Sequence, residues 1–298
     1  MAMKSLTEIP RNPALKMKSD IMFKAYFSRK ENEGFLKDLL ESILGKEIKI
    51  KRVMHDVKLD QLAREQKYGI LDLEVELEHG EIINVEMQLK NNRNIDERTV
   101  FYASKKVVEQ MEPGMKYEEL KKVIVIAILD YTLLNVPEYV TETVRVSAEH
   151  RDYEVNNIIK YYYVELEKFR NQNPDMSKPI NQWLAFLDME RGELLEMAKK
   201  ENKKISKAIE NYEVLTGDEE VKRLAEIKLM GDLEEQSALA TARARGTEIG
   251  LEQGEKIGRE QGEKRKQIEI AKKLLDLHIS LDKISTATGL SKEELENL

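Results

Sequence analysis

The chain has 298 residues, of which 41% are hydrophobic and 35% charged, and its formal net charge is −7. This composition is typical of a globular protein with one large core or two domains. The excess of acids argues against an extended basic surface that binds nucleic acid. A local nucleic-acid site is compatible with this net charge. Because the chain has no cysteine, it has neither a disulfide framework nor a thiolate metal site, and its four histidines are scattered without ligand spacing.

The N-terminal segment, residues 1–18, is predicted to be a basic, flexible arm with four cations, Lys4, Arg11, Lys16 and Lys18. These cations would either contact the backbone of a nucleic acid or stay solvated. A first helix is expected to begin after Ser19, a suitable N-cap, and a second, over residues 31–44, to end at Gly45.

Strands, a helix and a further strand follow these two helices. Alternating apolar and polar residues predict strands over residues 47–55, 69–77 and 81–90. Residues 95–111 have the pattern of a helix that ends before Pro113 and Gly114, and residues 121–131 contain the continuous apolar run of a buried strand. The predicted order is αβββαβ, and residues 139–150 and 158–169 are expected to add two more strands.

The register of the hairpin formed by residues 69–90 decides which side chains share a face. A two-residue loop at His79 and Gly80 would mix charged and apolar residues on both faces, whereas a three-residue loop that begins at Glu78 gives one dry face. In the second register Asp72 lies opposite Glu86, with Cβ atoms about 5 Å apart. A divalent cation between them would relieve their repulsion, and a solvated acidic surface is the alternative explanation.

The C-terminal part is predicted to be helical from residue 183 onward. Glycine recurs every fourth residue, at Gly246, Gly250, Gly254, Gly258 and Gly262. This stripe predicts either a helix that pairs with a second copy of the chain or a linker of variable length. The last 31 residues are similar to a helix-turn-helix with a capping box at Ser291 and Glu294, but the acids of the last helix favour a protein-contact module over DNA reading.

Four segments within about residues 15–170 have the sequences SDIMFKAYF, GILDLEVELEHGEIINVEMQ, ERTVFYASK and YEELKKVIVIAIL. Together they resemble the recombination-promoting nuclease and transposase-like group of the PD-(D/E)XK nuclease superfamily. The resemblance implies an α/β fold, with a restriction-endonuclease-like αβββαβ core, a mixed central sheet and flanking helices, followed by an all-α C-terminal region.

The resemblance also implies roles for individual residues. Asp72 and Glu86 match the two strand acids that bind metal in the superfamily, and Asp20 matches an acid that many members add from the first helix. Gln88 occupies the position of the superfamily's lysine, so it can orient water or donate an amide hydrogen bond but cannot supply a positive charge. That charge would come from Lys90 or Arg98, and Tyr102, one helical turn after Arg98, would offer a phenol to the phosphate.

The implied function is a Mg²⁺-dependent DNA endonuclease, with Mn²⁺ as a substitute ion, acting in recombination or element mobility. Two alternatives stay open: a catalytically weak or inactive nucleic-acid or protein-binding module of the same fold, and an assembly protein that works through residues 183–298. We expect DNA as the partner, a homodimer through the C-terminal helices, no membrane contact and a cytoplasmic location, since residues 1–20 lack the apolar run of a secretory signal. The expected divisions are an arm (1–18), a nuclease core (19–172), a helical region (173–235), a glycine-repeat helix or linker (236–268) and a small helical tail (269–298).

Overall fold

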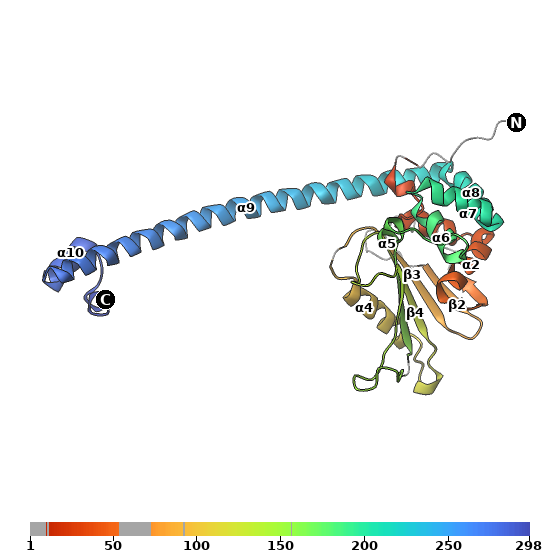
Figure 1. Ribbon diagram of the computed structural model, residues 1–298, viewed down its shortest axis with the longest axis horizontal. Coiled ribbons are helices and arrows are strands. Elements are labelled where there is room, and N and C mark those ends of the chain that lie inside the picture. Colours follow the sequence, from red (N-terminus) through yellow and green to blue (C-terminus); the bar gives the residue numbers. More distant parts are fainter. Residues whose placement is uncertain (1–9, 11, 54–72, 92, 156) are drawn as a thin grey trace. The chain divides into compact units, whose positions relative to one another are not determined.

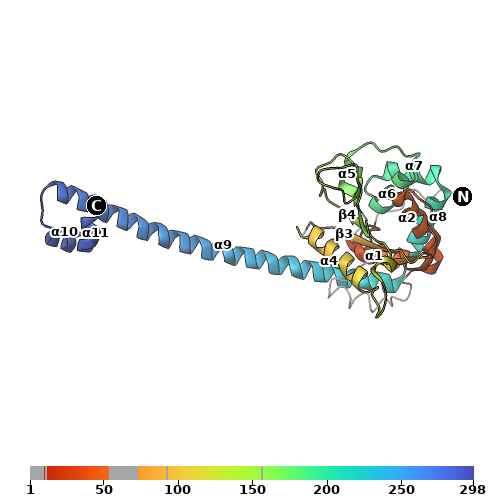
Figure 2. The ribbon, with the colours of Figure 1, turned by 90° about the horizontal axis from the view of Figure 1, so that it is seen from below.

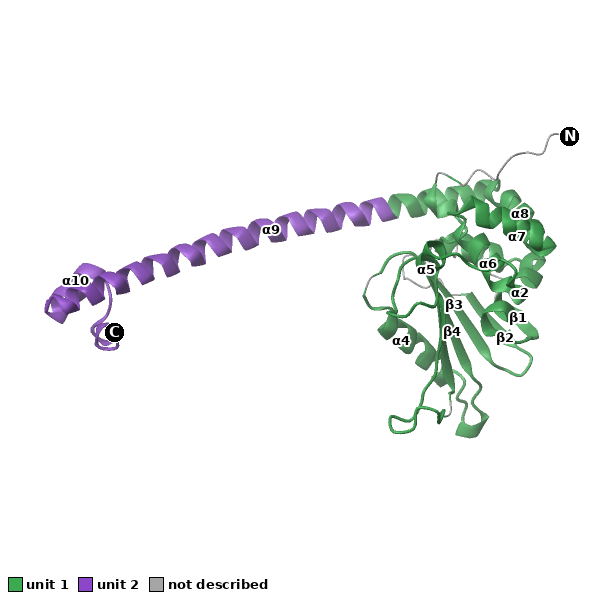
Figure 3. Cartoon of the chain, viewed as in Figure 1, with its two compact units in different colours: residues 1–231 green, residues 232–298 purple. Residues whose placement is uncertain are grey.

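The computed structural model describes residues 10, 12–53, 73–91, 93–155 and 157–298. It divides into two compact units, Met1–Gly231 and Asp232–Leu298 (Figure 3). Among the described residues, every helix is either too short or too polar to cross a lipid bilayer.

The first unit is built on a mixed sheet. In the described residues the sheet has six strands in the order β1-β2-β3-β4-β6-β5. The strands β3 and β4 and the strands β4 and β6 run parallel, and the other neighbours run antiparallel. The bounds are β1 Ile50–Val53, β2 Leu73–Leu77, β3 Ile82–Gln88, β4 Val123–Leu129, β5 Val140–Thr143 and β6 Ile159–Glu165. This mixed sheet, with its flanking helices and a long helical C-terminal part, confirms the predicted fold class.

The hairpin of β2 and β3 has the predicted three-residue loop. Leu73 pairs with Val85 and Val75 with Ile83, and Gly80 has a φ of +83°, the left-handed conformation that such a loop requires. The residues of the dry face are buried, as burial of one strand face demands. Asp72, the next residue before β2, lies outside the described residues.

One face of the sheet carries most of the hydrophobic core of this unit. It is covered by α1 (Asp20–Phe27) and α2 (Glu33–Leu44). The same core includes residues of α5 (Leu166–Asn171), α6 (Pro179–Asp188), α7 (Gly192–Glu201) and α8 (Lys203–Thr216), among them the fully buried Trp183 and Phe186 of α6 (Figures 1 and 2). The predicted caps are confirmed: the hydroxyl of Ser19 accepts a hydrogen bond from the N–H of Met22, and Gly45 ends α2 with a φ of +64°.

The other face of the sheet is covered by α4 (Ile95–Val108), whose Ala103 packs on Val123 and Val125. Figure 1 shows α4 on one side of the strands and α2 on the other. This helix ends at Val108, three residues earlier than the sequence predicts, because Gln110 and Met111 donate to the carbonyls three residues before them, a tighter turn than an α-helix.

Two further segments differ from the prediction. The expected strand over residues 158–169 is divided into β6 and the helix α5 (Leu166–Asn171), since Leu166 and Phe169 have helical spacing and both are fully buried. Only Val140–Thr143 of the expected strand over residues 139–150 forms part of the sheet.

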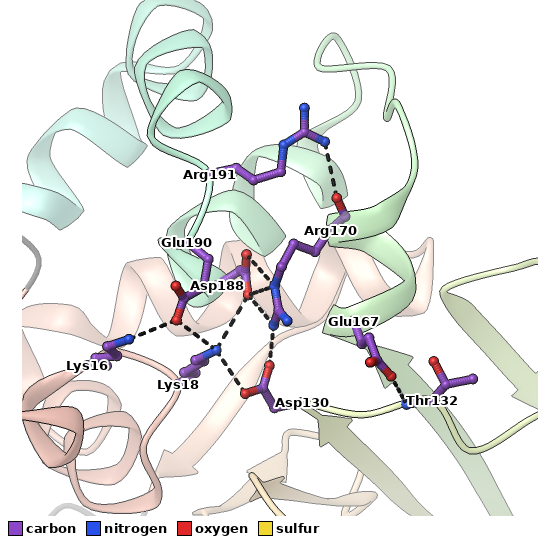
Figure 4. Close-up of polar contacts among 9 residues, drawn as sticks. All are labelled: Lys16, Lys18, Asp130, Thr132, Glu167, Arg170, Asp188, Glu190 and Arg191. Carbon is purple, nitrogen blue, oxygen red and sulfur yellow. Dashed lines mark hydrogen bonds and ion pairs between the residues drawn. The ribbon is translucent and has the colours of Figure 1, made fainter.

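The segment that precedes Ser19 is packed against the core in its described part, unlike the expected flexible arm. Pro13–Leu15 form a short helix, and Met17 is fully buried. The ammonium group of Lys18 lies 2.8 Å from a carboxylate oxygen of Asp130 and 3.1 Å from one of Glu190 (Figure 4). These two acids neutralise Lys18, which the sequence analysis considers as a contact for nucleic acid.

The C-terminal part is helical throughout, apart from short turns. Its helices are α6 Pro179–Asp188, α7 Gly192–Glu201, α8 Lys203–Thr216, α9 Glu219–Asp276, α10 Leu281–Thr288 and α11 Lys292–Glu296. The helix α9 has 58 residues and contains all five repeated glycines. The capping box at Ser291 and Glu294 is confirmed, and α10 and α11 pack on the end of α9 through Ala271, Ile284, Leu290 and Leu295.

Candidate active site

Glu86 and Gln88 lie at the end of β3, on the sheet face that α4 covers. They are separated by one residue and therefore point to the same side of the strand. Their neighbours on β4 are Ala127 and Leu129, which pack with Ile95 at the start of α4. The carboxylate of Glu86 is thus held in a largely apolar setting, and its side chain is only 8% exposed.

The guanidinium of Arg98 neutralises this buried carboxylate. Its Nη2 atom donates a hydrogen bond of 2.8 Å to Oε1 of Glu86. The same guanidinium lies 5.7 Å from the centre of the Tyr102 ring, one helical turn further along α4. Its Nε atom is buried and has no hydrogen-bond partner among the described residues. A buried carboxylate requires such a cation, and an unpaired N–H beside it can donate to an oxyanion.

Gln88 is held by a tyrosine that the sequence analysis did not select. The phenol of Tyr131 donates a hydrogen bond of 3.0 Å to Oε1 of Gln88, and the backbone N–H of Asp130 donates one of 3.0 Å to the carbonyl of Gln88. Burial, followed by the nearby negative charges of Glu86 and Asp96, raises the pKa of Tyr131 to about 12. The phenol is therefore protonated at neutral pH and can act as a donor.

Asp20 occupies the first position of α1, the helix that belongs to the core on the other face of the sheet. Its Oδ1 atom accepts a hydrogen bond from the N–H of Ile21, and its Oδ2 atom lies 3.5 Å from Nζ of Lys228 at the beginning of α9. Lys90 is exposed and is not part of β3, because the strand ends at Gln88 and not at residue 90 as predicted.

Four of the predicted residues, Glu86, Gln88, Arg98 and Tyr102, therefore come together between β3 and α4. Asp20 has a partner from a different helix, and Asp72 lies outside the described residues. Within the described part of the chain, no group of three or more His, Cys, Asp or Glu side chains could hold a metal ion. Glu86 nevertheless has the oxygen donors that Mg²⁺ prefers, and its burial beside a cation shows that this position accepts a positive charge.

The other acids of the hairpin also have cationic partners, which the sequence analysis did not foresee. Lys106, on α4, lies 2.7 Å from Glu74, and Lys51, on β1, lies 2.5 Å from Glu76. Glu74 and Lys106 are the less exposed of these two pairs, with 20% and 29% of their side chains accessible, against 25% and 59% for Glu76 and Lys51. They form a second strand-to-helix ion pair with which the buried pair of Glu86 and Arg98 can be compared.

Comparison with known proteins identifies the family of the chain. Residues 17–242 match the family model described as PD-(D/E)XK nuclease family transposase. Neither the curated proteins nor the solved structures contain a match. The matched range includes the whole sheet, the candidate site and the first part of α9. Since it extends over more than half of the chain, the protein belongs to the PD-(D/E)XK nuclease family transposases.

Proposed function

We propose that the protein is a Mg²⁺-dependent endonuclease that hydrolyses phosphodiester bonds of DNA. The observation that supports this most directly is the buried carboxylate of Glu86, paired with Arg98 and followed on the same strand face by Gln88. Its position at the end of the second strand of a hairpin is where the family resemblance expects a metal ligand. Recombination or the movement of a genetic element is the process that the family description suggests.

The metal would be held by oxygen atoms of Glu86 and Asp72. Asp20, whose helix α1 covers the other face of the sheet, would hold a second ion. The hairpin register predicted from the sequence places Asp72 opposite Glu86, although Asp72 lies outside the described residues. A bound Mg²⁺, or Mn²⁺ in its stead, would neutralise charge on the phosphate and lower the pKa of a water molecule. Lys228 neutralises Asp20 as Arg98 neutralises Glu86, so both carboxylates lie in surroundings that accept positive charge.

Arg98 is the residue that we expect to contact the phosphate of the substrate. Its guanidinium has a buried Nε with no partner among the described residues, and its Nη2 would leave Glu86 when a cation takes the carboxylate. The two N–H groups could then donate to two phosphate oxygens, the geometry that arginine favours. The ring of Tyr102 lies 5.7 Å from the guanidinium of Arg98 and can stabilise its position by a cation–π contact. Lys90 would add a solvent-exposed positive charge.

Gln88 would donate an amide hydrogen bond to the phosphate or to the attacking water. An amide carries no charge, so it cannot replace the electrostatic contribution of the lysine found at this position elsewhere in the superfamily. The guanidinium of Arg98, close to Glu86, supplies the positive charge that this substitution removes.

The proposal is tested by cleavage of supercoiled plasmid DNA in Mg²⁺ with the wild-type protein and the variants Asp72→Ala, Glu86→Ala and Glu74→Ala. We expect the first two variants to lose cleavage and Glu74→Ala to retain it, because Glu74 also bridges β2 to α4 but belongs to no proposed metal site. Equal activity in all four proteins would contradict the assignment of the site.

A catalytically weak or inactive module that binds nucleic acid is the second candidate. It is favoured by Gln88, because an uncharged amide at the position of the superfamily's lysine lacks the electrostatic contribution of that residue. The test mixes protein and DNA in equal concentrations and measures binding and Mg²⁺-dependent nicking. DNA binding without nicking would support this candidate over the nuclease.

A homodimer through the C-terminal helices is our proposal for the assembly of the chain. Within the second unit, α9 exposes six large apolar side chains among its charged residues: Leu233, Leu239, Ile249, Leu251, Ile257 and Ile270. Sedimentation of the wild-type chain and of an Ile249→Glu, Ile257→Glu variant tests it: the variant should be a monomer where the wild type is a dimer.

A further inference from the structure

Tyr131, just after the end of β4, forms a hydrogen bond with Gln88, the last residue of β3. The side-chain carbonyl of Gln88 accepts from the phenol at 3.0 Å. We propose that Tyr131 is a positioning residue that fixes the orientation of the Gln88 amide, so that its two N–H groups point away from the phenol and are available to the phosphate or the attacking water. This inference rests on the proposed nuclease function and names a residue that the function did not include.

The main chain next to Tyr131 is fixed by contacts of Asp130. The preceding residue, Asp130, donates its N–H to the carbonyl of Gln88, which ties the ends of β3 and β4 together. The carboxylate of Asp130 is in turn bound by Lys18 at 2.8 Å and by Arg170 (Figure 4). Because these contacts hold the backbone, the phenol has little freedom to move away from Gln88.

The ring of Tyr131 also has a defined place. It packs against the apolar cluster that includes Ala127, Leu129 and Tyr163, between the sheet and the start of α4. A ring held by packing carries its hydroxyl to one position, and this rigidity makes an aromatic side chain a suitable second partner for a catalytic group.

The surroundings determine which end of the amide faces the phenol. Three acids, Glu86, Asp96 and Glu165, raise the pKa of Tyr131, and each offers only acceptor oxygens when ionised. If the carbonyl of Gln88 were turned toward Glu86, two acceptors would face each other. With the carbonyl toward the phenol, the N–H groups of Gln88 can donate to acceptors, and a phosphate is one.

This arrangement explains why a glutamine needs a partner that a lysine would not need. An ammonium group has three equivalent donors and can rotate to meet an acceptor, whereas an amide has a donor end and an acceptor end and is useful in one orientation only. The hydrogen bond from Tyr131 selects that orientation.

The kinetic test compares Tyr131→Phe with Tyr163→Phe in the full-length protein. Both substitutions remove one phenol oxygen from the same apolar cluster, but Tyr163 donates to Asp96 at 3.2 Å and does not touch Gln88. We expect Tyr131→Phe to lower kcat for DNA cleavage by about 10- to 100-fold, the usual effect of removing a group that orients a catalytic residue, with KM for DNA little changed. Tyr163→Phe should retain wild-type kcat. Equal rates for Tyr131→Phe and the wild type would overturn the inference.

A double-mutant cycle separates orientation from general damage. In a Gln88→Lys background, Tyr131→Phe should change kcat by less than about twofold, because the lysine has no amide to orient. The same loss in both backgrounds would mean that Tyr131 acts by another route.

The side-chain amide resonance of Gln88 provides a readout that does not depend on activity. It is identified in the ¹⁵N–¹H spectrum by its absence in Gln88→Lys. Tyr131→Phe should shift this resonance, and Tyr163→Phe should leave it in place. An unshifted resonance in Tyr131→Phe would overturn the inference even if the enzyme is active. If the wild-type protein cleaves no DNA, the proposed function fails, and the spectrum alone decides whether Tyr131 orients Gln88.

Discussion

Arg98 on α4 bridges to Glu86 on β3 with a hydrogen bond of 2.8 Å, and this contact connects the helix to the strand that carries the candidate site. The same pair performs two tasks that mutation can separate. In the absence of a cation it neutralises a buried carboxylate, and in the proposed reaction it frees a guanidinium for the phosphate.

Arg98→Ala should destabilise the protein and increase the rise in Tm that Mg²⁺ causes. Removal of the guanidinium leaves the carboxylate of Glu86, 8% exposed, without this partner, and we expect a loss of about 1–3 kcal/mol in the free energy of unfolding. If Glu86 holds the metal, Mg²⁺ no longer competes with Arg98, so the rise in Tm on adding Mg²⁺ should be larger in the variant than in the wild type.

The control for this prediction is Lys106→Ala, which breaks the corresponding pair with Glu74 at the other end of α4. Its Mg²⁺-dependent rise in Tm should equal that of the wild type. A rise that is the same in Arg98→Ala and Lys106→Ala would argue that Glu86 is not a metal ligand.

Arg170→Ala should be among the more damaging substitutions in the first unit. The guanidinium binds both Asp188, whose side chain is 2% exposed, and Asp130, at the end of β4 (Figure 4). Truncation leaves these carboxylates with Lys18 as their remaining cation in the cluster, at 2.8 Å and 3.8 Å. We expect a loss of about 3 kcal/mol, measured by urea unfolding.

Arg52→Ala is the matched control, since it also removes an arginine from an ion pair. Arg52 lies 3.6 Å from Glu76 and its side chain is 66% exposed, so its removal should change the free energy of unfolding by less than about 0.5 kcal/mol. Similar losses for both variants would mean that burial does not determine the strength of the Arg170 contacts.

The charge of Glu190 should make the stability of the first unit fall at acid pH. A hydrogen bond from Lys16 lowers the pKa of Glu190 from its ordinary value of 4.5, with burial opposing and Lys18 adding to the effect. Because the pKa in the folded state is below that in the unfolded state, this stabilisation is complete above pH 4.5 and is lost as the pH falls through the folded pKa. Glu190→Gln should therefore reduce the dependence of Tm on pH below 4.5 and leave its slope at neutral pH unchanged; thermal unfolding between pH 3 and 7 measures this.

The hairpin shows what the sequence could predict about the site. Burial of Leu73, Val75, Ile83 and Val85 on one face is possible in one register only, so local alternation was sufficient to predict the loop and the face of Glu86. Arg98 was predicted near the site because it follows β3 closely in the chain, yet its contact with Glu86 depends on how α4 packs on the sheet.

Tyr131 and Lys228 show what the sequence could not predict. Tyr131 reaches Gln88 because β4 lies parallel to β3, a pairing between strands that are separated by a helix in the chain. Lys228 meets Asp20 from a helix that begins 199 positions later, at Glu219. Neither contact follows from periodicity or spacing, because both depend on long-range packing. The one signal in the sequence was a tyrosine two residues after the end of β4, the strand beside Gln88.

Replacement of repeated glycines by alanine should stabilise α9. A Cβ atom at Gly250, Gly254 or Gly258 would meet no atom within 4 Å beyond the adjacent residues and the local backbone of the helix, so the substitution removes the entropic cost of glycine without a clash. Each change should favour the helix by about 0.8–1 kcal/mol, and hydrogen exchange of the α9 amides should become slower. Ala242→Gly, on the same exposed helix, should have the opposite effect. If alanine instead weakened the protection and dissociated a dimer, the glycine face would be the surface on which a second copy of α9 packs, since only a close approach of two backbones makes an added methyl group unfavourable there.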